Sequence, residues 1–262
     1  MAFYGYIRKI AWNERRYPDM KVIIAENYED GAKKAADVIE KVVRDNPSCT
    51  LGLATGSSPV GMYRELARRC SEEGLDFSRV HSVNLDEYVG LEGTHEQSYR
   101  YFMDDNLFNH INIDKNNTYV AKGTGDVAAN LKEFNDVLDH TDIDIQVLGV
   151  GPDGHLGFNE PGDFLYDGAH EETLEESTIE ANKRFFARKE DVPTHAVTMG
   201  MGNIMRARRL LMIISGNKQD AARKLLLEDK IDSHCPCTFM RLHRDATVVI
   251  EKKLADEIGY KA

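Results

Sequence analysis

Ile143-Asp-Ile-Gln-Val-Leu148, followed by Gly149-Val-Gly-Pro-Asp-Gly-His-Leu-Gly-Phe-Asn-Glu160-Pro161, is the stretch of sequence that decides the fold. The apolar run predicts a buried strand of a parallel sheet, since such strands are covered on both faces. The four glycines and two prolines after it exclude a long helix, so the chain crosses the carboxyl end of the strand as a loop. Open α/β sheets bind their ligands at that edge. The stretch therefore predicts an α/β fold with a binding loop here.

Strand-like and helix-like segments alternate along the rest of the chain. Strands are predicted at 21–25, 50–54, 80–85, 117–120, 143–148, 209–214 and 246–250. Helices are predicted at 28–46, from Pro59 onward, and near 98–109, 126–139, 201–207 and 217–227. This alternation predicts a mostly parallel, doubly wound, Rossmann-like sheet with helices on both faces. Because no repeat or change of composition marks a linker, we expect residues 20–262 to form a single α/β domain, preceded by an N-terminal extension at 1–19.

Composition excludes several classes of partner. The formal net charge of −11 argues against nucleic acid or an acidic membrane surface, although a pocket can still bind a small anion. No apolar run approaches a membrane span, and residues 1–19 lack the apolar core of a signal peptide. The four cysteines are too few for a disulfide scaffold and fit a reducing, cytoplasmic location. The spacing of Cys235-Pro-Cys237 is tighter than that of zinc sites. The oligomeric state stays open.

The segment Ala54-Thr-Gly-Ser-Ser-Pro59 joins a predicted strand to a predicted helix. We expect Ser58 to cap a helix whose first turn begins at Pro59. Free N–H groups at a helix start, with nearby hydroxyls, favour phosphate binding. An ordinary capped helix is an equally good interpretation of this segment alone, and the segment is neither a Walker A motif nor a dinucleotide-binding motif. Arg184 and Lys218 are candidate cations for the same anion.

A pair of carboxylates, Asp86 and Glu87, follows the predicted strand at 80–85. A carboxylate at this edge of the sheet is a candidate general base. Adjacent side chains diverge, so we expect only one of the two to face a substrate. A helix cap or a surface turn is the alternative interpretation.

The loop after Leu148 carries Asp153, His155 and Glu160 within eight positions. An imidazole between two carboxylates is suited to moving protons, because a carboxylate fixes its tautomer and raises its basicity. A metal site is the alternative, but this spacing is not standard for zinc or for a two-histidine-one-carboxylate site. The residues alone therefore favour proton transfer over metal binding.

Together these segments resemble the glucosamine-6-phosphate deaminase family. The signatures occur in that family's order, in Leu53–Pro59, Asn84–Gly90, Gly151–Pro161, Ala181–Phe186 and Thr198–Gly202, with a similar spacer at 95–113. The resemblance covers about residues 20–250, and the combination of motifs is highly specific.

The resemblance implies a phosphosugar isomerase/deaminase fold without metal or cofactor. It implies conversion of the small-molecule phosphosugar glucosamine 6-phosphate, with water, to fructose 6-phosphate and ammonia in amino-sugar catabolism. Asp86 is then the base that moves a proton between C2 and C1, and His155, oriented by Asp153 and Glu160, opens the sugar ring. The phosphate is expected on Thr55, Gly56, Ser57, Ser58, Arg184 and Lys218.

One departure and two alternatives remain. The segment Asp163–Glu172 is acidic where family members with an allosteric amino-sugar-phosphate site carry basic and hydroxyl residues, so we expect no such activation. A 6-phosphogluconolactonase-like hydrolase of the same fold is expected to carry Asp-Glu-Arg, where this chain has Asp-Glu-Tyr88, and to lack Asn-Glu-Pro161. A non-catalytic sugar-phosphate-binding effector domain is expected to have lost Asp86 or His155.

Overall fold

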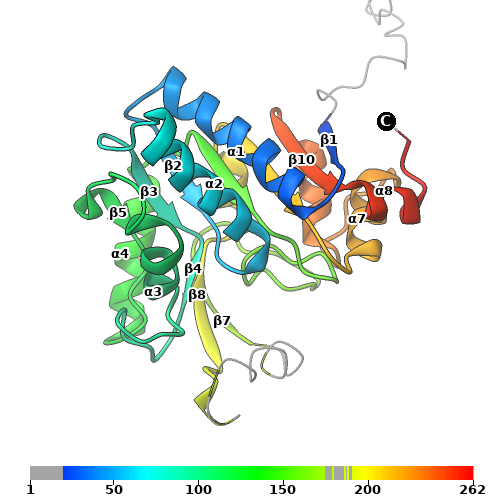
Figure 1. Ribbon diagram of the computed structural model, residues 1–262. Helices are drawn as coiled ribbons and strands as arrows, with labels where there is room; N and C mark the ends of the chain where they lie inside the picture. The colour runs from blue at the N-terminus through cyan, green and yellow to red at the C-terminus, as the bar shows by residue number, and fades with distance from the viewer. Residues whose placement is uncertain (1–19, 175–178, 180–185, 187, 189–190, 262) are drawn as a thin grey trace, which may run out of the picture.

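The computed structural model describes residues 20–174, 179, 186, 188 and 191–261. Its centre is a seven-stranded sheet in the order β1-β10-β9-β6-β2-β3-β5, and all neighbouring strands in it are parallel (Figure 1). The strands are β1 (Lys21–Ala25), β2 (Thr50–Leu53), β3 (His81–Asn84), β5 (Thr118–Tyr119), β6 (Ile145–Leu148), β9 (Leu210–Ile214) and β10 (Ala246–Glu251). Each of them lies where the hydrophobic pattern predicts a strand.

Both faces of this sheet are covered. All the residues of β9 are buried, and since successive side chains of a strand point to opposite faces, other elements must pack on each side. Helices α1 (Tyr28–Asp45) and α2 (Ser57–Glu73) pack against each other and reach β9 (Figure 1). The other α-helices are α3 (Tyr99–Met103), α4 (Val127–Asp139), α6 (Met201–Arg206), α7 (Gln219–Leu226) and α8 (Lys252–Ile258). The predicted α/β class is confirmed, and no helix in the described ranges is long and apolar enough to cross a membrane.

Helix α1 illustrates how local sequence sets these elements. The side chain of Asn27 accepts a hydrogen bond from the backbone N–H of Asp30, which satisfies one of the free donors at the helix start. Small and branched apolar residues then recur at helical spacing and are buried against the sheet and α2. The helix therefore begins and ends close to the predicted bounds.

A second, three-stranded antiparallel sheet was not predicted. It has the order β4-β8-β7, with β4 at Asp86–Tyr88, β7 at His170–Thr173 and β8 at His195–Thr198. It projects from one side of the large sheet (Figure 1). Its own small core is formed by Tyr88, Leu91, Phe158, Leu174 and Ala196. Strands of three or four residues, two of them rich in charge, carry no readable alternation, so the sequence pattern does not reveal them.

Two predicted helices differ from the structure. The predicted N-cap Ser58 is wrong, because α2 begins at Ser57 and its N-cap residue is Gly56, with no side-chain cap. Gly56 has φ of 89°, which ends the preceding loop in a conformation that glycine adopts easily and that places both serines in the first helical turn. The single helix predicted near 98–109 is short α3 followed by a π-helical turn at Asp104–Phe108.

The 149–161 loop is held by backbone hydrogen bonds and by two glycines in the left-handed region. Gly154 has φ of 98°, its carbonyl accepts a hydrogen bond from the N–H of Cys237 at 2.8 Å, and a side chain there would collide with Cys235. Gly157 has φ of 60°. The buried amide of Asn159 donates to the carbonyls of Leu156 and Met199, at 2.9 and 2.8 Å. The loop is thus a rigid platform at the end of β6.

Candidate active site

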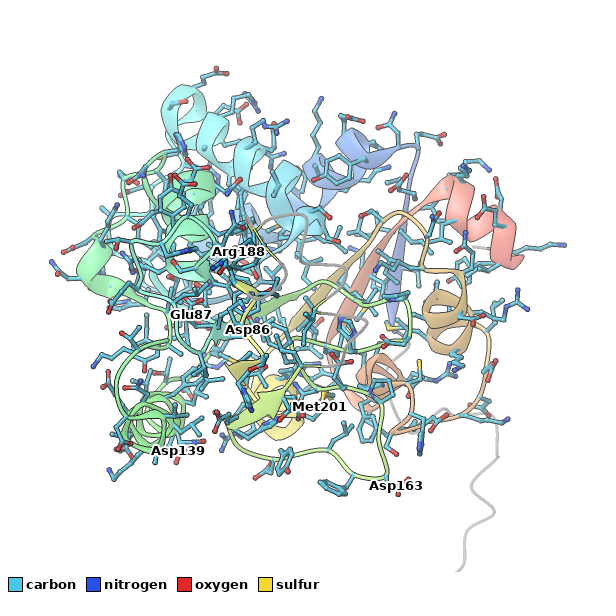
Figure 2. The ribbon with its side chains drawn as sticks, turned by 90° about the horizontal axis from the view of Figure 1, so that it is seen from below. Asp86, Glu87, Asp139, Asp163, Arg188 and Met201 are labelled. Atoms are coloured by element: carbon cyan, nitrogen blue, oxygen red, sulfur yellow. The ribbon has the colours of Figure 1, made fainter. Side chains whose placement is uncertain are left out.

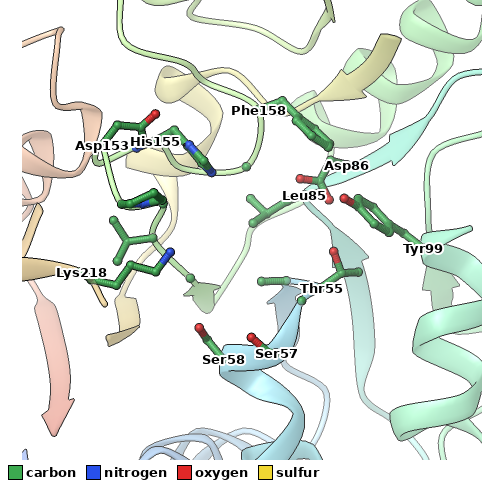
Figure 3. A pocket seen from close by; sticks show the side chains of 17 residues that line it. Thr55, Ser57, Ser58, Leu85, Asp86, Tyr99, Asp153, His155, Phe158 and Lys218 are labelled. Carbon is green, nitrogen blue, oxygen red and sulfur yellow. Dashed lines mark hydrogen bonds and ion pairs between the residues drawn. The ribbon is translucent and has the colours of Figure 1, made fainter. Parts of the chain in front are cut away.

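A pocket of about 350 Å³ opens at the carboxyl ends of the central strands (Figure 3). This volume lies within the usual range for small-molecule sites. The lining comes from the loops after β2, β3, β6 and β9 and from the start of α3, namely Ala54–Ser58, Leu85, Asp86, Tyr99, Gly149–Asp153, His155, Gly157, Phe158 and Lys218. The three strand ends that carry polar motifs in the sequence therefore meet at one cavity.

One end of the pocket is suited to an anion. The first turn of α2 has no side-chain cap, so its N–H groups and the hydroxyls of Ser57 and Ser58 are open to a ligand. Figure 3 shows these hydroxyls and the amino group of Lys218 directed into the same space. Burial lowers the pKa of Lys218, and the negative charge of Asp153 partly offsets this effect. Arg184, the other predicted cation, lies outside the described residues.

Asp86 lies at the other end, where the small sheet meets the large one (Figure 2). It is 5 % exposed, and its Oδ1 is buried without a hydrogen-bond partner in the part of the chain that the structure describes. Burial, with the nearby charge of Glu87, raises the pKa of Asp86 to about 8, while His155 acts in the opposite direction. Glu87 does not line the pocket. Of the two adjacent carboxylates, only Asp86 faces the cavity.

His155 stands between two carboxylates. Its Nδ1 is 2.8 Å from Oδ1 of Asp153 and 3.4 Å from Oε2 of Glu160, although neither contact has the straight geometry of a full hydrogen bond. Desolvation lowers the pKa of His155, but the two carboxylates together outweigh it and raise the pKa to about 9. Burial raises the pKa of Asp153, but the contact with His155 outweighs burial and lowers that pKa to about 2. Glu160 contacts Nδ1 of the ring but does not line the pocket.

The same three residues have the composition of a metal site, with ligand atoms within 4.8 Å of one another. Their present spacing places the carboxylates against the imidazole rather than around a central ion. The ring nitrogen engaged by carboxylates is Nδ1, which leaves Nε2 for a ligand in the pocket. This arrangement suits proton transfer at Nε2.

Tyr99 and Phe158 also line the pocket, and sequence reasoning assigned them no role. Their rings lie nearly parallel, 7° apart, with centroids separated by 6.2 Å. Figure 3 shows the hydroxyl of Tyr99 turned toward the carboxylate of Asp86. Tyr99 lies in the 95–113 spacer, which resembles the corresponding segment of the family. That position was the one signal in the sequence that pointed to it.

Comparison with known proteins identifies the family. Residues 25–249 match the family model described as glucosamine-6-phosphate isomerases/6-phosphogluconolactonase. The chain is 49% identical over 241 residues to a glucosamine-6-phosphate deaminase of Clostridium perfringens (strain 13 / Type A), covering 90% of this chain and 98% of that protein. It is 44% identical to a glucosamine-6-phosphate deaminase of Thermoanaerobacter sp. (strain X514), covering 91% and 95%.

Solved structures agree with this result. A monomeric glucosamine-6-phosphate deaminase superposes with a TM-score of 0.87 at 39% identity, covering 90% of this chain and 99% of that one. The 6-phosphogluconolactonase of Trypanosoma brucei superposes with a TM-score of 0.71 at 15% identity, covering 91% and 98%, and shares the fold. The chain belongs to the glucosamine-6-phosphate deaminase (glucosamine-6-phosphate isomerase) family.

Proposed function

We propose that this protein converts glucosamine 6-phosphate and water to fructose 6-phosphate and ammonia. The observation that carries the proposal is the pairing, within one pocket, of an uncapped helix start with a buried carboxylate whose pKa is raised. A phosphate held at the first turn of α2 leaves the far end of a hexose near Asp86. Binding energy from the phosphate then positions carbons that the enzyme does not otherwise hold.

The first step is ring opening at His155. The hydrogen at C2 becomes acidic only when C1 is a carbonyl, so the pyranose must open before any carbon acid chemistry. A protonated His155 gives a proton to O5 through Nε2 and recovers one from the hydroxyl on C1, and no net proton is consumed. Asp153 and Glu160 keep the ring charged near neutral pH, since they raise its pKa to about 9.

The second step is proton transfer between carbons by Asp86. The carboxylate removes the C2 proton, the electron pair forms the C1–C2 double bond, and the carbonyl oxygen of C1 gains a proton. Returning a proton to C1 gives an imine at C2, to which water adds before ammonia leaves. Atoms balance with one water consumed. A pKa of about 8 makes Asp86 a far stronger base than an exposed aspartate, which suits it to a weak carbon acid.

The test is ammonia release by the purified protein. Glucosamine 6-phosphate is supplied beside galactosamine 6-phosphate, N-acetylglucosamine 6-phosphate and 6-phosphogluconolactone, and both ammonia and the ketose phosphate are measured. We expect equal amounts of both products from glucosamine 6-phosphate. Hydrolysis of the lactone without ammonia from any amino sugar contradicts the proposal in favour of a lactonase. Binding of the phosphosugars without turnover contradicts it in favour of an effector domain.

We place the enzyme in the cytoplasm, acting on a free small molecule rather than on nucleic acid or a membrane. All four cysteines are free thiols, including Cys235 and Cys237, whose sulfur atoms lie 3.6 Å apart. Such a pair stays reduced most easily in a reducing compartment. The negative net charge opposes nonspecific binding to phosphate backbones. Cell fractionation with an antibody to the protein tests the location.

A further inference from the structure

We propose that Glu87 is a positioning residue for the deamination: it ties β4 to α3, so that Tyr99 is fixed over the base, and it tunes that base electrostatically. Glu87 does not line the pocket and is 1 % exposed. It therefore acts through Asp86 and Tyr99, not on the substrate. The inference rests on the proposed function, since it assigns a role within that reaction.

The carboxylate of Glu87 accepts hydrogen bonds from three backbone N–H groups. Its Oε1 accepts from the N–H of Tyr88 and of Tyr99, both at 2.8 Å, and its Oε2 accepts from Arg100 at 3.0 Å. Tyr99 and Arg100 are the first two residues of α3, whose N–H groups have no partner within the helix. A carboxylate at this place satisfies them and faces the positive end of the helix dipole. Glu87 thus joins two segments that are twelve residues apart in the chain.

This tether fixes one wall of the pocket. Asp86 and Glu87 are neighbours on β4, so their side chains point in opposite directions, one into the cavity and one toward α3. Holding the start of α3 holds Tyr99, which stacks on Phe158 and turns its hydroxyl toward Asp86 (Figure 3). Loss of the tether displaces a group beside the reacting carbons, where errors of about 1 Å are costly.

The negative charge of Glu87 also acts on the base, because it raises the pKa of Asp86. Among the described residues, the titratable groups that interact electrostatically with Asp86 are Glu87 and Tyr88 from β4, Tyr99 from α3, His155 from the 149–161 loop and Tyr63 from α2. Burial keeps the three tyrosines neutral in the working range, since it raises each pKa further above 10. Of the charges on described residues, those that remain are His155, which lowers the pKa of Asp86, and Glu87, which raises it. Burial raises the pKa of Glu87 itself to about 7, against the three N–H contacts, so its charge is present where Asp86 titrates.

The test compares the pH dependence of kcat/KM in the wild-type protein and in Glu87→Gln. The acidic limb of the wild-type profile is expected near pH 8, where Asp86 loses its proton. Removing the like charge should move that limb about one unit toward acid. We also expect kcat to fall by about tenfold or more while KM changes by less than about twofold, because the phosphate site at the start of α2 is unchanged. Substrate ionisations are common to both proteins, so the difference reports the enzyme.

Two further variants serve as controls, and the first separates the charge of residue 87 from its side-chain length. Glu87→Asp keeps the charge but not the length, so its kcat should fall while the limb stays in place. If Glu87→Gln does not fold, Glu87→Asp still tests the tether through its kcat. Asp126→Asn neutralises the acid that caps α4, remote from the pocket, and should change neither quantity.

The outcomes are distinct. A limb that stays in place in Glu87→Gln, or a limb that moves equally in Glu87→Asp, overturns the electrostatic role. An unchanged kcat in both variants overturns the tether. A wild-type protein that releases no ammonia overturns the proposed function instead, and is recognised before any variant is made.

Discussion

Nδ1 of His155 lies 2.8 Å from Oδ1 of Asp153, and that carboxylate is fixed in turn by the backbone N–H of His155 at 3.1 Å. Asp153 therefore contacts both the ring and the backbone N–H of His155. Gly154 between them has φ of 98°, a backbone conformation that glycine adopts easily. Asp153 and Glu160 together raise the pKa of His155, and the three-residue turn keeps Asp153 beside the ring.

Asp153→Asn should lower the pKa of His155 from about 9 toward its ordinary value. If a protonated ring donates to O5, the basic limb of kcat/KM moves toward acid, and kcat falls by about 10²-fold or more. The pH profile of the variant, measured beside that of Asp142→Asn on the exposed surface, checks this. A basic limb that does not move rules out His155 as the titrating acid.

The same contact predicts a stability difference with a definite pH window. The pKa of His155 is higher in the folded protein than its ordinary value of 6.5. Its contribution to stability is therefore fully present below about pH 6.5 and is lost as the pH rises through about 9. The difference in melting temperature between wild type and His155→Asn should be largest near pH 6 and smallest above pH 9, with each limit good to about one pH unit. Parallel curves across this range contradict the assignment.

Asp86→Asn should abolish exchange of the C2 hydrogen with solvent while the protein becomes more stable. The pKa of Asp86 is raised, so the folded state disfavours its ionisation: the penalty is absent below about 3.8 and grows as the pH rises toward about 8. Replacing the buried, unpartnered carboxylate should raise the free energy of unfolding at pH 8 by roughly 1–3 kcal/mol. Urea unfolding at pH 8 and at pH 4 measures the difference. Surviving exchange excludes Asp86 as the base.

The large sheet was predictable because its central strands form largely apolar runs that are separated by amphipathic helices. In β9 and β10 nearly every residue is buried, so the hydrophobic run is the strand. The small sheet was hidden because β7 and β4 carry charged residues in three- or four-residue strands whose partners lie far along the chain. Their pairing is set by tertiary contacts, and no local pattern records it.

The residues of the candidate site also fall into those that the sequence pattern predicts and those that tertiary contacts place. Asp86, Asp153 and His155 follow apolar runs directly, so their convergence on the carboxyl edge of the sheet follows from topology. Tyr99 lines the pocket at the start of α3, where its N–H donates to Glu87, and a hydrogen bond between residues twelve positions apart is invisible to periodicity. Ser58 was misassigned because Pro59 marks the first turn, while the left-handed Gly56 lets the helix start earlier.

Lys218→Met should weaken phosphate anchoring without altering the chemistry. The ammonium is half-buried opposite the uncapped start of α2, so its loss removes a positive charge from the predicted phosphate site. We expect KM for glucosamine 6-phosphate to rise by about 10- to 100-fold, with a smaller change in kcat, consistent with about 1.5–3 kcal/mol for a charge-assisted contact. Lys122→Met removes an exposed lysine paired with Glu133 and is the matched control. An unchanged KM places the phosphate elsewhere.

The velocity curve should be hyperbolic in the absence and presence of N-acetylglucosamine 6-phosphate, because the 163–172 segment is acidic and its carbonyls already accept hydrogen bonds from the start of α6. The N–H groups of Met201 and Asn203 at the start of that helix already donate to the carbonyls of Tyr166 and Asp167, at 2.8 and 3.0 Å. Asp163 lies at the edge of the molecule (Figure 2), almost fully exposed, and adds negative charge. Initial rates over a wide substrate range test this. A sigmoidal curve that the effector makes hyperbolic contradicts it, whereas a parallel rise in apparent KM reports competition at the pocket.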